Sequence, residues 1–174
     1  MKTYILLTDS FDPYYNLAAE ELVLKYIDEG KVILHLWQSY DTVVIGKHQN
    51  PWAETFPKLL RSENITLASR FTGGGTVFHD KGNLNYCFAM DKNIYDVKRQ
   101  MGVILSAIES FGIDASFNGR NDLISHGQKF SGSAFCLKKN AALHHGTLLI
   151  NSDIKRLRKF LKPSNIKITE KGIK

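Results

Sequence analysis

The middle of the chain reads Arg70-Phe71-Thr72-Gly73-Gly74-Gly75-Thr76-Val77-Phe78-His79-Asp80. This stretch lies between two runs that are typical of β-strands, Ile65–Ala68 and Asn83–Met90, and Thr76–Phe78 resumes an extended pattern after the glycines. Three successive glycines cost backbone entropy, so they indicate a place where the chain takes a positive φ or passes close to another group. The stretch therefore predicts strands joined by a loop whose backbone conformation matters.

Helical and extended patterns alternate irregularly on both sides of this loop. Further strands are expected at Lys2–Leu7, Val32–Trp37, Thr42–Ile45, Asp114–Phe117, Leu123-Ile124 and Thr147–Ile150. Helices are expected at Tyr14–Ile27, at Trp52–Leu60, at Val97–Phe111 and after a capping Asp153, where Pro163 ends the last one. Because there is no strict βαβ alternation, the sequence predicts an α+β domain, with helices covering one side of a mixed or mainly antiparallel sheet.

Composition is that of a globular domain. The chain has 174 residues, of which 43% are hydrophobic and 23% charged, which suffices for one core. Residues 1–150 contain 15 Lys and Arg against 15 Asp and Glu, whereas residues 151–174 contain 8 against 2. We therefore expect residues 1–150 to form the core of the domain and residues 151–174 to form a basic segment of the same domain. A charge excess confined to one terminal segment does not favour a nucleic-acid partner.

The sequence also favours a cytoplasmic protein without a membrane partner. No apolar run approaches the roughly 18 residues that span a bilayer, and Asp9 comes too soon for a signal-peptide core. Two cysteines, Cys87 and Cys136, are too few and too widely spaced for a disulfide framework or a zinc site. Reduced thiols in a cytosol are the simplest interpretation.

The glycine loop is the first candidate site. Successive backbone N–H groups in such a loop can form an anion-binding concavity, and Arg70 adds a cation whose fork matches phosphate geometry. The loop is not a Walker loop, because no Gly-Lys-Ser/Thr follows it. The alternative is a glycine-rich hairpin turn with an exposed arginine.

A second candidate lies downstream. Lys129 stands between predicted short strands, in Gln128-Lys129-Phe130-Ser131-Gly132-Ser133-Ala134, where it could contact a phosphate or carboxylate oxygen. Asn121 and Asp122 carry oxygen ligands of the kind that Mg²⁺ takes beside nucleotide phosphates. The alternative is a solvated turn with a surface lysine.

Histidines, cysteines and aromatic residues leave further alternatives open. His144 and His145 could serve metal or acid–base chemistry, but neighbours in a strand point to opposite faces, so a structural role is equally compatible. Lysines beside Cys136 could lower the pKa of its thiol, whereas Cys87 fits a buried strand position. An aromatic group is expected in the core or in a pocket wall: Tyr14, Tyr15, Trp37 and Trp52.

Taken in order, these segments resemble the lipoate–protein ligase A family, within the wider biotin/lipoate ligase fold. The matching segments are Asp9–Glu21, Leu36–Gln38, Val43–Trp52, Arg70–Asn85, Gly119–Asp122, Gln128–Ala134, His144–Leu149 and Lys171–Ile173. The resemblance implies that lipoate and MgATP react to give lipoyl-AMP and pyrophosphate. A lysine of an acceptor lipoyl domain then attacks the activated carbonyl, the acceptor being an E2 subunit of an oxo-acid dehydrogenase or the glycine-cleavage H protein.

The resemblance also implies roles for individual residues. Lys129 would be the catalytic residue, in contact with the lipoyl carbonyl and the α-phosphate. Arg70 and the loop Gly73, Gly74, Gly75, Thr76, Val77 and Phe78 would hold ATP and lipoyl-AMP. Asn121 and Asp122 would contact the adenylate, with Asp122 as the expected Mg²⁺ ligand. Trp37 and His79 would border the lipoate tail.

Two departures from the family pattern stand out. Ser69 occupies a position where family members often have a second arginine. Family catalytic domains also continue beyond a Lys-Gly-Ile segment, and many add an accessory domain, so the resemblance implies a fragment, a truncated product or half of a split enzyme. We accordingly expect residues 155–174 to be mobile.

Two other functions are compatible with the same segments. One is an octanoyl or lipoyl transferase that works through a cysteine acyl-enzyme and needs no ATP. The other is a non-catalytic module that binds lipoyl-AMP or lipoyl domains.

Overall fold

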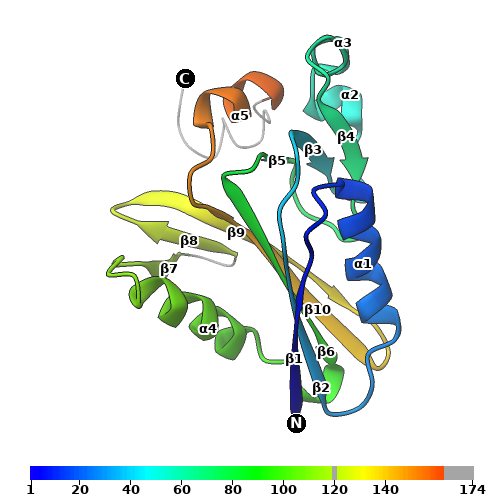
Figure 1. The fold of residues 1–174 in the computed structure, drawn as a ribbon, viewed down its shortest axis with the longest axis vertical. Coiled ribbons are helices and arrows are strands. Elements are labelled where there is room, and N and C mark those ends of the chain that lie inside the picture. The colour runs from blue at the N-terminus through cyan, green and yellow to red at the C-terminus, as the bar shows by residue number, and fades with distance from the viewer. Residues whose placement is uncertain (119–120, 163–174) are drawn as a thin grey trace.

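The computed structural model describes residues 1–118 and 121–162 and contains two sheets (Figure 1). Seven strands of this part of the chain form the larger sheet. In spatial order they are β1 (Lys2–Leu7), β2 (Lys31–Trp37), β6 (Asn83–Asp91), β10 (Ala141–Leu149), β9 (Gln128–Leu137), β8 (Asp122–Ser125) and β7 (Ser116–Asn118). Among the described strands of the larger sheet, only β1 and β2 pair in parallel, and the other neighbouring strands pair antiparallel. The expected α+β fold with a mixed, mainly antiparallel sheet is thus confirmed.

The smaller sheet has the order β4 (Thr66–Ser69), β3 (Thr42–Ile45) and β5 (Val77–His79). Its strands pack with α3 (Pro57–Ser62) and with the last described helix, α5 (Ile154–Phe160). A short helix, α2 (Pro51–Glu54), precedes α3. The loop that holds the three glycines connects β4 to β5, so the ends of this sheet fix where the loop begins and ends.

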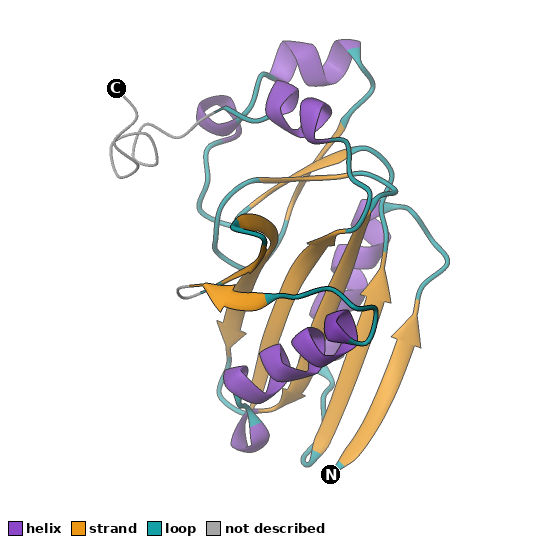
Figure 2. Cartoon of the chain, turned by 90° about the vertical axis from the view of Figure 1, so that its left-hand side faces the viewer, coloured by secondary structure: helices purple, strands orange, loops and turns teal. Residues whose placement is uncertain are grey.

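Helices cover both faces of the larger sheet, so the expectation of one covered side is wrong (Figure 2). The helix α1 (Pro13–Lys25) packs on β6 and β10 from one face, and α4 (Val97–Glu109), which follows the 3₁₀ turn η1 (Lys92–Ile94), packs on the other. The alternation of side chains along β6 explains both contacts. Tyr86, Phe88 and Met90 face α4, whereas Cys87 faces Leu24 of α1.

Side-chain caps set the beginnings of the helices. Asp12 accepts hydrogen bonds from the backbone N–H groups of Tyr14 and Tyr15, and Asp153 does the same for Lys155 and Arg156. The cap by Asp153 was expected from the sequence and is confirmed; Pro163, expected to end that helix, lies outside the described residues.

Three expected elements differ from the structure. The single helix expected at Trp52–Leu60 is two helices, because Pro57 has no N–H to continue the first one. Lys129, which was expected between short strands, lies inside the ten-residue strand β9. The sequence did not predict this strand because its glycine residues have low strand propensity. The strand expected at Thr147–Ile150 begins at Ala141.

Residues 154–160 form a packed helix rather than a mobile segment. Phe160 is fully buried and lies against Phe78 of β5, with ring centroids 5.3 Å apart. Arg156 forms a bidentate ion pair with Asp41. The expectation of mobility is therefore wrong for residues 155–160, and residues 163–174 lie outside the described part of the chain.

None of the described helices has both the length and the apolar composition needed to cross a membrane. Within the same residues, Cys87 and Cys136 are both free thiols.

We predict that Phe160→Ala lowers the free energy of unfolding by about 3–5 kcal/mol, because it leaves a cavity against Phe78. Chemical denaturation measures the loss. Ile154→Ala is the matched control on the same helix, since Ile154 is 43% exposed and should cost far less. Equal effects of the two substitutions would show that α5 does not belong to the core.

Candidate functional site

One row of residues across the larger sheet forms the floor of a cavity. The strand register aligns Trp37 with Asn85, Asn85 with Thr147, Thr147 with Gly132, and Gly132 with Asp122. All five residues line the same cavity of about 220 Å³. With four steps of about 4.8 Å between strands, the row is about 19 Å long. The floor is thus elongated, with Trp37 at one end and Asp122 at the other.

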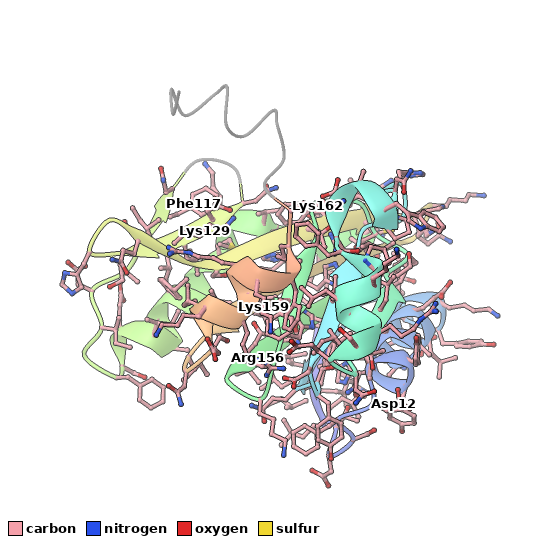
Figure 3. The ribbon with its side chains drawn as sticks, turned by 90° about the horizontal axis from the view of Figure 1, so that it is seen from above. Asp12, Phe117, Lys129, Arg156, Lys159 and Lys162 are labelled. Atoms are coloured by element: carbon pink, nitrogen blue, oxygen red, sulfur yellow. The ribbon has the colours of Figure 1, made fainter. Side chains whose placement is uncertain are left out.

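A β-bulge turns Lys129 toward the cavity. Leu123 pairs with Ser131 while the next residue, Ile124, pairs with Lys129, so Phe130 is an extra residue in β9. The extra residue puts Lys129 on the same face as Gly132 and Asp122. Its Nζ lies 2.7 Å from Asp122 Oδ1, and its side chain is 56% exposed. Lys129 therefore presents a positive charge at the Asp122 end of the floor. Figure 3 labels its side chain, which lies on the same side of the molecule as Phe117.

The glycine loop lies over this floor and is shaped by the buried side chain of Arg70, which is 7% exposed. The guanidinium donates to the carbonyl oxygens of Gly73 at 2.8 Å and Gly75 at 2.7 Å, and to that of Val44 at 3.3 Å. Burial lowers the pKa of Arg70 to about 10, which still leaves it charged near neutral pH. The expected phosphate-binding cation is thus bonded to carbonyl oxygens of its own loop.

This arrangement leaves the donors of the loop available. The carbonyl groups of Gly73 and Gly75 turn inward to Arg70, whereas the N–H groups of Gly73, Gly74, Gly75 and Thr76 donate to no described residue. The three glycines are exposed. A run of N–H groups without protein acceptors can form an anion-binding concavity. Arg70 orients the backbone of this loop by binding its carbonyl groups.

At the opposite end of the floor, two buried polar side chains lack partners within residues 1–118 and 121–162. His79 is 4% exposed and neither ring nitrogen has a hydrogen bond, and the Nδ2 of Asn85, which is 3% exposed, has none either. Burial lowers the pKa of His79 to about 3, with a smaller effect of the charge on Arg70. Trp37 stands edge-on to His79, with ring centroids 5.7 Å apart. The Trp37 end of the cavity therefore has buried polar atoms, on His79 and Asn85, that are available to a ligand.

A buried carboxylate, which the sequence did not single out, connects these parts. Glu20 of α1 is 1% exposed and accepts a hydrogen bond from Trp37 Nε1 at 2.9 Å. Its other oxygen lies 2.7 Å from Nδ1 of His145. Leu17, Glu20 and Leu24 share the buried side of α1. A charged residue in that stripe was the signal that could have identified Glu20.

Most of the sequence candidates come together around the cavity. Its lining includes Trp37, Arg70, Gly74, Gly75, Thr76, Val77, His79, Asn121, Asp122 and Lys129. Gly73 and Phe78 are not part of the lining: Gly73 faces Arg70 through its carbonyl, and the Phe78 side chain packs in the core. Gly119 and Arg120 lie outside the described residues.

The two neighbouring histidines point to opposite faces, as strand geometry predicts. His145 faces the cavity, whereas Nδ1 of His144 lies 2.9 Å from Gln100 of α4. No group of three or more potential metal ligands occurs among the described His, Cys, Asp and Glu residues. Asn121 Oδ1, which has no described partner, and the Asp122 carboxylate are nevertheless oxygen donors at the cavity, and Mg²⁺ bound with substrate phosphates needs few protein ligands.

Of the four aromatic residues expected in the core or in a pocket wall, only Trp37 is buried. Trp37 is 3% exposed, but Tyr14 and Tyr15 are each 59% exposed and Trp52 is 70% exposed. The prediction was therefore wrong for these three side chains, which lie on the surfaces of α1 and α2.

Neither cysteine lines the cavity in the described structure. Cys87 is fully buried, and burial raises the pKa of its thiol, an effect that the charge on Glu20 reinforces. Cys136 is half-buried and packs against the core cluster that contains Cys87 and Leu143.

We predict that Gly74→Ala destabilises the protein by about 1–3 kcal/mol, the range for a residue held at an unfavourable φ. Gly74 has a φ of 95°, and an added Cβ would lie 2.8 Å from Arg70 Nη2. Gly73→Ala is the matched control, because nothing lies within 4 Å of a Cβ there. Thermal or chemical denaturation measures both; equal losses would contradict the loop geometry.

We also predict that His79→Phe changes how stability depends on pH. Between an unfolded pKa of 6.5 and a folded pKa of about 3, only the unfolded protein takes up a proton on His79. Stability linked to His79 is present above pH 6.5 and is lost as the pH falls toward 3. The wild type should therefore lose about 1.4 kcal/mol per pH unit relative to the variant. Denaturation at pH 6, 5 and 4 measures the difference; a constant difference would refute the assignment.

Three solved structures are similar to this chain, and two of them hold lipoate or ATP. The crystal structure of P. falciparum LipL1 in complex with lipoate has a TM-score of 0.86 and 35% identity, over 94% of this chain. A bipartite lipoate protein ligase from Thermoplasma acidophilum, described with its E2 lipoyl domain, has a TM-score of 0.86 and 28% identity, over 98% of this chain. Lipoate-protein ligase A bound with ATP has a TM-score of 0.86 and 27% identity, over 96%.

The chain spans about half, 52%, of the length of LipL1. It spans 70% of the T. acidophilum ligase and 74% of lipoate-protein ligase A. The family model for the lipoyl protein ligase A/B catalytic domain matches residues 12–174. Together with the fold and the cavity, this match shows that the chain belongs to the lipoyl protein ligase A/B catalytic domain family.

Proposed function

We propose that this protein activates lipoate with ATP and transfers the lipoyl group to a lysine of an acceptor lipoyl domain in the cytoplasm. The observation that carries the proposal is a single cavity lined by Lys129, the donor-rich glycine loop and the Trp37 end of the floor. Its relatives were solved with lipoate and with ATP. The length of the floor suits an acyl chain followed by a phosphate.

The first step needs positive charge and N–H donors. The lipoate carboxylate attacks the α-phosphorus of ATP, a bond to the carboxylate oxygen forms, and the bond to the departing pyrophosphate breaks. Both reactants are anions, so donors placed where charge accumulates lower the barrier. The N–H groups of Gly74, Gly75 and Thr76 would bind the phosphates, and Lys129 would contact the α-phosphate and the acyl carbonyl.

Asp122 and Asn121 would hold Mg²⁺, which supplies further positive charge beside the phosphates when it is bound. Lys129 and Asp122 already form an ion pair. We infer that this pair keeps the Lys129 ammonium at the mouth of the cavity before substrates arrive.

In the second step, the acceptor amine attacks the acyl carbonyl and AMP leaves. No nucleophile from this chain is needed, because the amine comes with the partner. Lys129 is exposed, so the carbonyl beside it would be accessible from solvent. The T. acidophilum ligase was described together with its E2 lipoyl domain, which supports a lipoyl domain as the acceptor. We propose the glycine-cleavage H protein as a second acceptor.

The far end of the cavity favours lipoate over a plain acyl chain. A methyl terminus would leave the donors of His79 and Asn85 buried and unpaired, which is unfavourable. The sulfur atoms of a dithiolane are polarisable and accept weak hydrogen bonds. We therefore place the dithiolane between Trp37 and His79.

A cysteine-dependent transfer is less compatible with this geometry. Cys87 is fully buried with a raised pKa, and neither thiol lines the cavity within the described structure. A thiol nucleophile must reach the acyl carbonyl as a thiolate.

Lipoate-dependent exchange of labelled pyrophosphate into ATP tests the proposal. The wild type should exchange, and Lys129→Ala should lose at least about 100-fold, the scale for removing one donor to a developing charge. The fold should survive, because the Lys129 side chain is 56% exposed.

Lys138→Ala is the control, because Lys138 is an exposed lysine just beyond the same strand and outside the cavity lining. Full exchange by Lys129→Ala would refute the role of Lys129. Absent exchange by the wild type, with measurable lipoyl-AMP binding, would favour the non-catalytic module; absence of both would refute the proposal.

A further inference from the structure

A continuous buried chain of hydrogen bonds runs from the acyl end of the cavity to the glycine loop. Trp37 donates to Glu20, and the second oxygen of Glu20 lies 2.7 Å from His145 Nδ1. Nε2 of His145 lies 2.8 Å from Thr72 Oγ1, which accepts from Arg70 Nε at 3.2 Å. The members of this chain, which we call the Glu20 relay, are Trp37, Glu20, His145, Thr72 and Arg70.

Every member of the relay is buried, with exposures between 1% for Glu20 and 8% for His145. Glu20 and Arg70 form no direct ion pair in the described structure, and hydrogen bonds through His145 and Thr72 connect them. Unpaired buried charges are strongly unfavourable. The relay connects α1, β2, β10 and the loop after β4, four separate segments of the sequence.

The role of Glu20 follows from which atoms of the relay carry a proton. A carboxylate only accepts, so His145 must carry a proton on Nδ1. We assign His145 the Nδ1–H tautomer, in which the unprotonated Nε2 accepts the Thr72 hydroxyl proton. The Thr72 oxygen is left with lone pairs for the Arg70 Nε–H. Each donor thereby has an acceptor. The Arg70 Nε–H is shared between Thr72 Oγ1 at 3.2 Å and the Gly73 carbonyl at 3.1 Å, and Nη2 donates to the carbonyls of Gly73 and Gly75.

We propose that Glu20, His145 and Thr72 are positioning residues that act through Arg70 to hold the glycine loop in its anion-binding form. The proposal rests on the proposed function of the cavity and extends it to residues that need not touch the nucleotide. It assigns Glu20 a role in ATP binding although Glu20 borders Trp37 at the other end of the cavity.

Glu20→Gln tests the proton count without changing the shape of the side chain. The amide oxygen can still accept from Trp37, but the amide NH₂ now donates to His145 Nδ1 and shifts the ring proton to Nε2. Thr72 then faces two donors, from His145 and Arg70, and its own proton has no acceptor in the relay. We expect the loop to loosen, and the KM for MgATP in pyrophosphate exchange to rise about tenfold, the effect of one lost charge-assisted hydrogen bond. The KM for lipoate should change little.

Nuclear magnetic resonance gives a readout that is independent of activity. The ¹⁵N signals of His145 should show the Nδ1–H tautomer in the wild type and the Nε2–H tautomer in Glu20→Gln. The backbone amide signals of Gly73, Gly74 and Gly75 should shift with it. If the wild type lacks exchange but shows this tautomer, the proposed function fails and the relay stands.

Gln100→Leu is the matched control. Gln100 of α4 contacts His144 Nδ1 at 2.9 Å on the opposite face, so its loss breaks the same kind of helix-to-strand hydrogen bond. It should leave the glycine amides and the KM for MgATP unchanged.

Thr72→Val and Thr72→Ser keep the test decisive if Glu20→Gln does not fold. Valine removes the hydroxyl and should raise the KM for MgATP about as much as Glu20→Gln, whereas serine keeps the hydroxyl and should restore the wild-type value. Unchanged glycine amides and unchanged MgATP dependence in the folded Glu20→Gln or Thr72→Val protein would overturn the proposal.

Discussion

The buried guanidinium of Arg70 is the constraint on which the site depends. A positive charge that is 7% exposed must be surrounded by acceptors, and here the carbonyl oxygens of Gly73, Gly75 and Val44 supply them. Carbonyl groups that turn inward leave the N–H groups of the loop for an anion. Where the loop bends around this side chain, Gly74 takes a φ of 95°, a conformation that favours glycine.

The larger sheet contributes length and alignment. Its register brings Trp37, Asn85, Thr147, Gly132 and Asp122 into one row, and the bulge at Phe130 turns Lys129 onto that face. Both sheets therefore contribute side chains to one cavity: Trp37 and Lys129 come from the larger sheet, and Val77 and His79 come from the smaller one. The helix α1 links two strands of the larger sheet, because the Glu20 carboxylate contacts Trp37 of β2 and His145 of β10.

Sequence reasoning identified the residues of the loop and the helix caps because these depend on local chemistry. Asp153 begins a helix, and the three glycines mark a loop, regardless of what lies opposite. It missed β9 and the exposure of Trp52, because serine and glycine are poor strand formers and an aromatic side chain can lie on a surface as well as in a core. It also placed Arg70 as a free cation, since no local pattern reveals which acceptors surround a side chain.

The sequence by itself determined the α+β class, the family resemblance, and the residue types available for binding a phosphate and an acyl chain. The tertiary structure alone decided that Lys129 and the glycine loop share a cavity, that His144 and His145 serve opposite faces, and that Glu20 reaches Arg70 through His145 and Thr72. These contacts join residues up to 125 positions apart. Strand register and burial fix them, and both are properties of the packed chain rather than of any local segment.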